Sequence, residues 1–439
     1  MGVATVGCTS RRRAATLAIA IGEKTMDLEE IEAQVKAGTD VRQVRALTGH
    51  ATSQGQTLRE RFRAAMFYRQ VDKLPNFEFG YWAETLGEWH QQGLPTTIKD
   101  ERSAYAFFGI ENWQSAWLNY GPLPAFKYRE LERTAEYLIY QDAGNARCRI
   151  NLQGHKSIRQ HLEFGLKTRA DWERDYRPRL VPDDPARVPA NWPELAAAYR
   201  QRDFPLAIGV GSMIGTPRNW IGFDRIAMMV YDDPALLEEI VEHQCQVVLN
   251  VLARVLPTVE FDFGTGWEDI CFNSGPIVGE RFMRDVVGPR YRRIADLLQR
   301  HGVFLTWTDC DGNLSRISDV FVDNGYNCFF PCEVNGGTDP VALREKHGTR
   351  ARFQGGFCKM KFLHGPQAIE DELLRLKPVV DEGGFIPGVD HRVQADAPLA
   401  NYLYYLKRKR ELFQVGGTPQ YDEGKVGLKR DGTVEFPKL

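Results

Sequence analysis

The stretch VFLTWTDCDGN, residues 303–313, changes character at its middle. Its first six residues are apolar or β-prone and include neither glycine nor proline, which predicts a buried strand. Two acids, a thiol and a glycine turn follow directly. Ligands and proton carriers gather where the strands of a parallel sheet end, so this stretch predicts an enzyme site at the carboxyl edge of such a sheet.

Further strands alternate with helices along the chain. Strands are predicted over residues 76–82, 205–211, 259–264, 303–308, 327–331, 351–356 and 383–387, with helices over 58–68, 83–92, 234–255, 282–301, 314–324, 340–348, 366–382 and 399–415. A weakly marked unit near 154–166 brings the count to about eight. This alternation implies parallel pairing with right-handed crossovers, and eight units would close a (β/α)8 TIM barrel. An open doubly wound sheet is the alternative, but the chain contains neither GxGxxG nor GxxxxGK[ST].

Two additions to the barrel are predicted. Residues 1–55 read as an N-terminal extension, partly helical over 27–38 and 41–47 or disordered, and residues 56–439 as the barrel domain. Residues 136–141 and 147–151 flank the turn sequence Asp-Ala-Gly-Asn, which predicts an inserted hairpin.

Composition limits the classes of partner. The chain has 439 residues, 43% of them hydrophobic, and a net charge of −2, so charge provides no drive toward nucleic acid or an anionic membrane. No apolar run reaches the roughly 18 residues of a membrane span. The eight cysteines form no CxxC pair, which favours reduced thiols in a cytoplasmic protein. We therefore expect a small-molecule substrate, with a homodimer as an open option.

Polar residues follow several predicted strands. Asp309 and Asp311 are two apart, so an extended backbone puts both carboxylates on one face, where they could bind a divalent metal with His391, share a proton, or simply cap the next helix. Cysteines and aromatics at other strand ends could equally be core residues. The predicted catalytic residues are Asp309, Asp311, His391 and Glu333, with Asp309, Asp311 and His391 as metal ligands; the predicted substrate-binding residues are Tyr81, Trp82, Trp267, Glu268, Cys332 and Cys358.

Several blocks in order resemble the uroporphyrinogen decarboxylase superfamily, in its decarboxylase-like branch near the corrinoid-dependent methyltransferases. They are LRERF (58–62), VDKLPNFEFGYW (71–82), WHQQGLP (89–95), WEDICFNSGP (267–276), PCEVNGGTD (331–339) and GGFIPGVDHRVQADAPLANYLYY (383–405). The resemblance implies a (β/α)8 barrel with its site at the carboxyl mouth. Zinc-dependent relatives hold the metal with a His-x-Cys pair and a late cysteine, and the matching positions here read Asp309-x-Asp311 and His391.

The resemblance implies one of three functions. The first is a methyltransferase or demethylase, possessing a zinc site, that passes a methyl group from a small methylated donor to a corrinoid carried by a partner protein. The second is a decarboxylase, acting on uroporphyrinogen or another acid, that requires no cofactor. However, residues 76–82 lack the arginine-rich motif with which true uroporphyrinogen decarboxylases bind the propionate groups of their substrate. The third is a binding barrel without catalysis.

Overall fold

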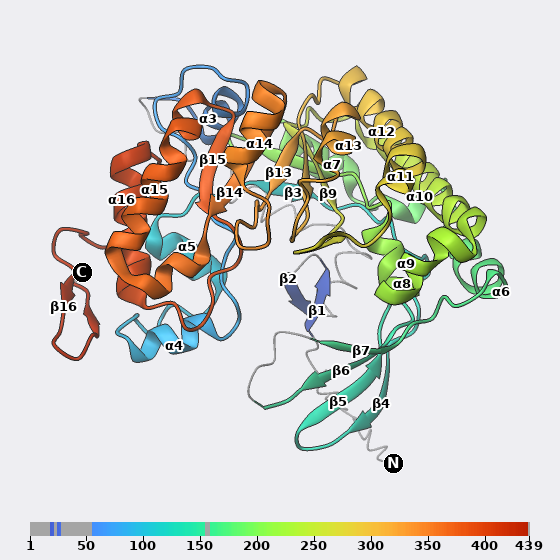
Figure 1. The fold of residues 1–439 in the computed structure, drawn as a ribbon, viewed down its shortest axis with the longest axis horizontal. Helices are drawn as coiled ribbons and strands as arrows, with labels where there is room; N and C mark the ends of the chain where they lie inside the picture. Colours follow the sequence, from blue (N-terminus) through green and yellow to red (C-terminus); the bar gives the residue numbers. More distant parts are fainter. Residues whose placement is uncertain (1–17, 22–23, 28–54, 154–158, 438–439) are drawn as a thin grey trace, which may run out of the picture.

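The structure is a computed structural model that describes residues 18–21, 24–27, 55–153 and 159–437. Its centre is a seven-stranded parallel sheet in the order β15-β14-β13-β12-β9-β8-β3, which curls within a layer of helices (Figure 1). These strands are β3 Gln114–Ala116, β8 Leu206–Gly209, β9 Phe263–Trp267, β12 Thr306–Asp309, β13 Cys328–Phe330, β14 Arg352–Phe357 and β15 Phe385–Val389.

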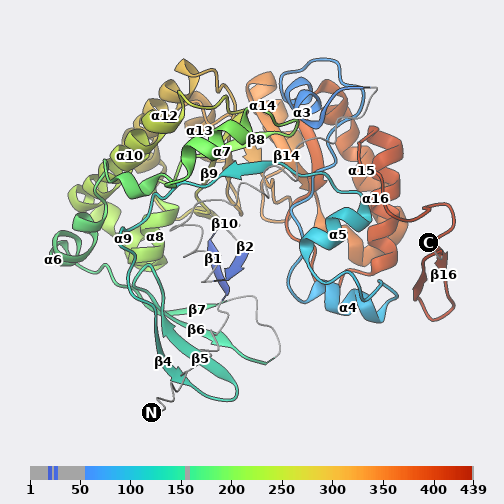
Figure 2. The ribbon, with the colours of Figure 1, turned by 180° about the vertical axis from the view of Figure 1, so that it is seen from behind.

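Helices connect the strands and cover the outside of the sheet. Helices α10, α12 and α13 lie toward one end and α15 and α16 toward the other (Figure 2). The helices are α3 Leu58–Met66, α4 Thr85–Gln91, α5 Glu101–Phe108, α6 Arg169–Asp171, α7 Trp192–Tyr199, α8 Gly215–Ile221, α9 Phe223–Asp232, α10 Pro234–Val255, α11 Glu280–Phe282, α12 Gly288–Arg300, α13 Ser318–Asp323, α14 Pro340–His347, α15 Gly365–Glu382 and α16 Leu399–Phe413, with short π or 3-10 turns η1 Trp172–Tyr176, η2 Arg177–Arg179, η3 Pro185–Arg187, η4 Met283–Val287, η5 Gly348–Arg350 and η6 Lys359–His364.

The α/β class is confirmed, but within the described residues the sheet is not closed by an eighth strand. The segment predicted as the first strand, residues 76–82, is extended without a hydrogen-bonded ladder. Single contacts hold it instead: the Val393 amide donates to the Gly80 carbonyl at 3.0 Å, and the Glu111 amide donates to the Asn76 carbonyl at 2.9 Å. The molecule is thus TIM-like, with a seven-stranded curled sheet and an irregular segment where a closed barrel would have a strand.

The predicted hairpin is present as part of a larger insertion. Strands β4 Arg129–Arg133, β5 Tyr137–Gln141, β6 Arg147–Asn151 and β7 Gln160–Glu163 form an antiparallel sheet that lies apart from the barrel, below α8 and α9 in Figure 1. The unit predicted near 154–166 therefore does not belong to the barrel, because β7 pairs with β6.

Short antiparallel pairs make up the rest: β1 Ala18–Ile21 with β2 Lys24–Asp27, β10 Cys271–Phe272 with β11 Gly275–Pro276, and β16 Gly427–Leu428 with β17 Val434–Glu435. Apart from Asp27, which ends β2, both helices predicted in the N-terminal extension lie outside the described residues. No helix in the described part of the chain is long and apolar enough to cross a membrane.

Aromatic side chains fill the interior of the curled sheet. The ring of Trp307 on β12 lies 4.7 Å from Phe263, 4.9 Å from Trp113 and 4.9 Å from Phe330, between ring centroids. Trp307 is buried, and so is most of the aromatic and aliphatic cluster around it. The interior is a packed core, so a ligand has room at the strand ends rather than within the sheet.

Candidate active site

The carboxyl ends of three neighbouring strands meet side by side. Asp309, the last residue of β12, is in register with Trp267 at the end of β9 and with Phe330 at the end of β13. The Asp309 carbonyl accepts the Glu268 amide at 2.9 Å, which continues the pairing beyond the ladder. Residues that follow these strands therefore gather at one rim.

Asp311 and His391 are in direct contact at this rim. The Asp311 Oδ2 atom lies 3.1 Å from the His391 Nε2 atom, and the two side chains are 22% and 6% exposed. They follow β12 and β15, which are three places apart in the sheet. Strands three places apart in a flat sheet are separated by about 14 Å, so curvature of the sheet is needed to bring the two loops together.

Two aromatic rings fix the imidazole. Trp82 stacks on His391 at 5.4 Å and an interplanar angle of 27°, and Phe79 meets it edge-on at 5.3 Å. Phe79 in turn packs against Phe330 at 4.6 Å. The irregular segment that replaces a barrel strand thus supplies the walls around the histidine. Phe79 was not singled out from the sequence, where only its place beside Gly80 and Tyr81 could have indicated it.

Asp269 joins the rim to α8. It has a φ of +46°, in the left-handed region that glycine, asparagine and aspartate adopt more readily than other residues. Its Oδ1 atom accepts the Asp311 amide at 3.3 Å, and its carbonyl accepts a hydrogen bond from the Arg218 guanidinium. That guanidinium lies over the Trp267 ring at 4.8 Å, so Trp267 is at the rim with one face covered.

Glu333 lies next to the acidic loop. Its Oε2 atom accepts the Gly312 amide at 3.1 Å, and its Oε1 atom accepts from Lys359 Nζ at 3.2 Å. Asp390 is buried nearby and accepts the Val334 and Lys359 amides at 3.0 and 2.9 Å. Burial raises the pKa of Asp390 to about 7. Sequence reasoning did not select Lys359 or Asp390, although they adjoin Cys358 and His391, which it did select.

Three other predicted site residues, Tyr81, Cys332 and Cys358, have buried side chains. Tyr81 is buried, with its hydroxyl 2.9 Å from that of Tyr402, because Gly80 at φ +103° interrupts the alternation of the extended segment. Cys332 and Cys358 are buried, and burial raises the pKa of both thiols. A raised pKa favours the protonated form of both thiols, and their predicted role in substrate binding stays a prediction.

Glu268 is also buried, and both of its oxygens are occupied. Oε2 accepts from Ser212 Oγ at 3.0 Å and from the Ile214 and Gly215 amides at 2.9 Å; Oε1 accepts from the Met213 amide at 2.7 Å and the Tyr291 hydroxyl at 2.8 Å. These donors surround the start of α8. Glu268 therefore stabilises the start of that helix, and its role in substrate binding stays a prediction.

Comparison with known proteins supports the fold. No protein-family model matches the sequence, and no curated protein matches it. Among solved structures, a methyltransferase from Methanosarcina mazei aligns with a TM-score of 0.55 and 15% sequence identity, over 82% of this chain and 100% of the other. At this identity the similarity shows a shared fold.

Proposed function

We propose that the protein is a methyltransferase that takes a methyl group from a small methylated donor bound at the carboxyl rim of the sheet. The observation that carries the proposal is the contact between Asp311 and His391, which come from distant parts of the chain. The rings of Phe79 and Trp82 pack against the His391 side of this contact. The fold shared with the Methanosarcina methyltransferase supports it. The resemblance of the sequence to the uroporphyrinogen decarboxylase superfamily supports it as well.

Two side chains of the rim offer donor atoms that a zinc-like ion accepts, the Asp311 carboxylate and the His391 imidazole. In the described part of the chain, Asp309 does not complete a group of three ligand atoms within 4.8 Å of one another with them, so its role as a third ligand stays a prediction. Two ligand atoms of one tetrahedral zinc ion lie about 3.3 Å apart, close to the 3.1 Å between Asp311 Oδ2 and His391 Nε2. When bound, such an ion would supply Lewis acidity that polarises the bond between the methyl group and its leaving atom.

The chain's own residues orient the reactants. Asp311 and the rings of Phe79 and Trp82 fix the plane of His391, so that one face of the rim is held rigid. Glu333 and Lys359 form a half-buried ion pair beside the acidic loop, within reach of a polar end of the donor. For the methyl acceptor we propose a corrinoid carried by a separate protein, as the resembled branch uses.

The decarboxylase alternative receives less support. A polyanionic tetrapyrrole needs cations that are free to pair with its carboxylates. Two arginines near the rim already have acidic partners: Arg218 Nη1 lies 3.4 Å from Asp269, and Arg392 donates to Glu101 at 2.8 Å. These two arginines therefore do not supply the free positive charges that a uroporphyrinogen decarboxylase needs to bind its substrate.

A methyl-transfer assay tests the proposal. Purified protein, with its metal content measured, is incubated with methylated alcohols, amines or thiols and free cob(I)alamin, and methylcobalamin is followed by its visible spectrum. We expect transfer from at least one donor, and a loss of about 100-fold or more in Asp311→Asn. Asp381→Asn, an exposed acid on α15 that pairs with Lys377, is the matched control and should retain full activity. Carbon dioxide release from an acid without methyl transfer would favour the decarboxylase instead.

A further inference from the structure

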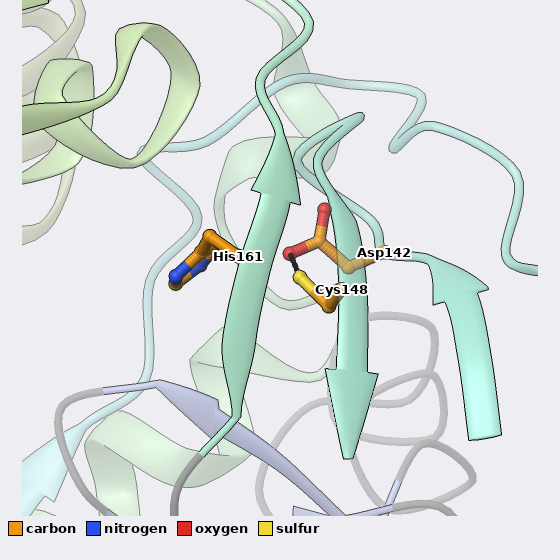
Figure 3. A group of neighbouring side chains, drawn as sticks. All are labelled: Asp142, Cys148 and His161. Atoms are coloured by element: carbon orange, nitrogen blue, oxygen red, sulfur yellow. Dashed lines mark hydrogen bonds between the residues drawn. The ribbon is translucent and has the colours of Figure 1, made fainter. Parts of the chain in front are cut away.

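A second group of metal-ligand side chains lies in the inserted sheet. One ligand atom each from Asp142, Cys148 and His161 lies within 4.8 Å of the other two (Figure 3). Cys148 on β6 and His161 on β7 are register partners across the two strands, and Asp142 follows β5 at the hairpin turn. The three side chains therefore converge through the strand pairing of the sheet itself.

The geometry leaves ligand atoms of this group available. Asp142 Oδ1 accepts the Gly144 and Ala146 amides at 2.9 and 2.8 Å, which fixes the carboxylate and turns Oδ2 toward the Cys148 thiol at 3.8 Å. His161 Nε2 is buried without a hydrogen-bond partner among the described residues, while its ring stacks on Phe164 at 5.2 Å. A buried ring nitrogen without a partner is costly unless something binds it.

The surroundings explain what an ion could contribute. The insertion has its own small core, formed by Leu138, Tyr140, Ala146 and Cys148. A core of this size contributes little to the stability of the sheet. Small folds with such cores often rely on a bound metal or a disulfide for stability. Cys148 is itself one of the four, so an ion bound there would link the core to β7.

Two guanidinium groups oppose a cation here. Arg159 Nη1 lies 3.4 Å from Asp142 Oδ2, and the charge of Arg218 also acts on His161. Burial lowers the pKa of His161 to about 4, so the ring is neutral and able to coordinate, and burial raises the pKa of Cys148 to about 12. An ion that binds must displace the thiol proton to water, and the resulting thiolate adds one negative charge to that of the Asp142 carboxylate.

We propose that Asp142, Cys148 and His161 bind a zinc-class divalent ion that links β5, β6 and β7 and stabilises the insertion. A thiolate, an imidazole and a carboxylate form a set that suits zinc or cobalt, with a fourth position for water. This site is distinct from the rim, where Asp309, Asp311 and His391 include no sulfur ligand.

Cobalt spectroscopy on the full chain tests the site, because a thiolate ligand adds a sulfur-to-cobalt charge-transfer band that oxygen and nitrogen ligands cannot give. We expect wild-type protein titrated with Co(II) to show the band, and Cys148→Ala to lose it. Cys310→Ala, a buried thiol beside the rim, and Asp311→Asn should both keep it. Absence of the band in the wild type, or its persistence in Cys148→Ala, would overturn the proposal.

Arg159→Gln provides a test that keeps every ligand and does not depend on the folding of Cys148→Ala. Removing the competing guanidinium should lower the Co(II) dissociation constant read from the same band. An unchanged or higher constant would contradict a site at Asp142. Because the rim has no thiolate, failure of this proposal leaves the methyltransferase proposal standing, and the reverse also holds.

Discussion

Glu268 accepts five hydrogen bonds in a space that water does not reach. In Glu268→Gln, one oxygen becomes an amide that points hydrogens at donors, so we expect a loss of about 2 to 3 kcal/mol in the free energy of unfolding. Urea denaturation measures this loss. Glu238→Gln, whose parent side chain is half exposed, should change the free energy of unfolding little. If Glu268→Gln keeps its stability but binds donor poorly, the substrate-binding role predicted from the sequence would be correct.

Trp82 contributes to the rim by holding the His391 ring. Trp82→Ala removes a stacked pair worth about 1 kcal/mol, so we expect kcat/KM for methyl transfer to fall about fivefold. Trp82→Phe keeps an aromatic face and should recover most of the activity. Steady-state kinetics on the two variants separate this role from mere filling of space, and equal activity in Trp82→Ala and the wild type would contradict it.

At the scale of elements, the irregular segment 76–82 is held by a buried ion pair. Lys409 Nζ on α16 donates to Glu78 Oε1 at 2.6 Å, Tyr405 donates to the same oxygen at 2.8 Å, and Glu78 Oε2 accepts the Val389 amide at 2.8 Å. These contacts connect the segment to β15 and α16. They replace the ladder that a regular eighth strand would have made.

Breaking this pair should loosen the segment. In Lys409→Met the Glu78 carboxylate stays buried without its cation, so we expect a loss of about 3 to 5 kcal/mol in unfolding free energy. Adding Glu78→Gln should restore much of that loss, because the unpaired charge is gone. Chemical denaturation of the single and double variants measures both effects. A double variant that is less stable than Lys409→Met would count against the ion pair as the cause.

The turn between β5 and β6 depends on a left-handed residue. Asn145 has a φ of +70°, which side chains other than asparagine, aspartate or glycine adopt at a cost. Asn145→Ala should therefore lower the thermal midpoint of unfolding, at a cost of about 1 kcal/mol, while Asn145→Gly should stay close to the wild type. Calorimetry of the two variants decides whether backbone strain or the lost side chain is responsible.

Element boundaries were predictable where signals are local. Helix α10 has the bounds read from the sequence, because the Asp233 side chain caps it at Leu236 and its apolar residues recur at helical spacing. Strand β9 was placed too early, over 259–264, since Gly264 and Gly266 have low strand propensity and only pairing with β8 and β12 makes them a strand. Strand β3 was missed because its three residues gain their structure from β8 alone.

For the whole molecule, buried histidines predict acid sensitivity. Burial lowers the pKa of His347 and of His243 below the ordinary value of about 6.5. Below pH 6.5 these histidines bind protons in the unfolded chain that they do not bind in the folded chain, so their contribution to the free energy of unfolding should decline as pH falls from about 6.5 toward 5. Asp390, whose pKa burial raises to about 7, contributes in the opposite direction over this range. Urea midpoints across this range measure the decline. Replacing both histidines by glutamine should reduce the decline without abolishing it, because burial lowers the pKa of His161 as well. An unchanged slope would assign the effect to other groups.

The sequence by itself determined the α/β class, the order of most helices and strands, and the presence of polar residues such as Asp311 directly after a strand. These depend on local periodicity, caps and strand ends, which a linear chain records. Only the tertiary structure decided that the sheet curls without an eighth ladder, that Asp311 meets His391, and that Tyr81 and Glu268 turn away from the rim. Those outcomes depend on the curvature of the sheet and on hydrogen-bond partners distant in sequence, such as Tyr402 for Tyr81. The local pattern of residues predicts neither of them.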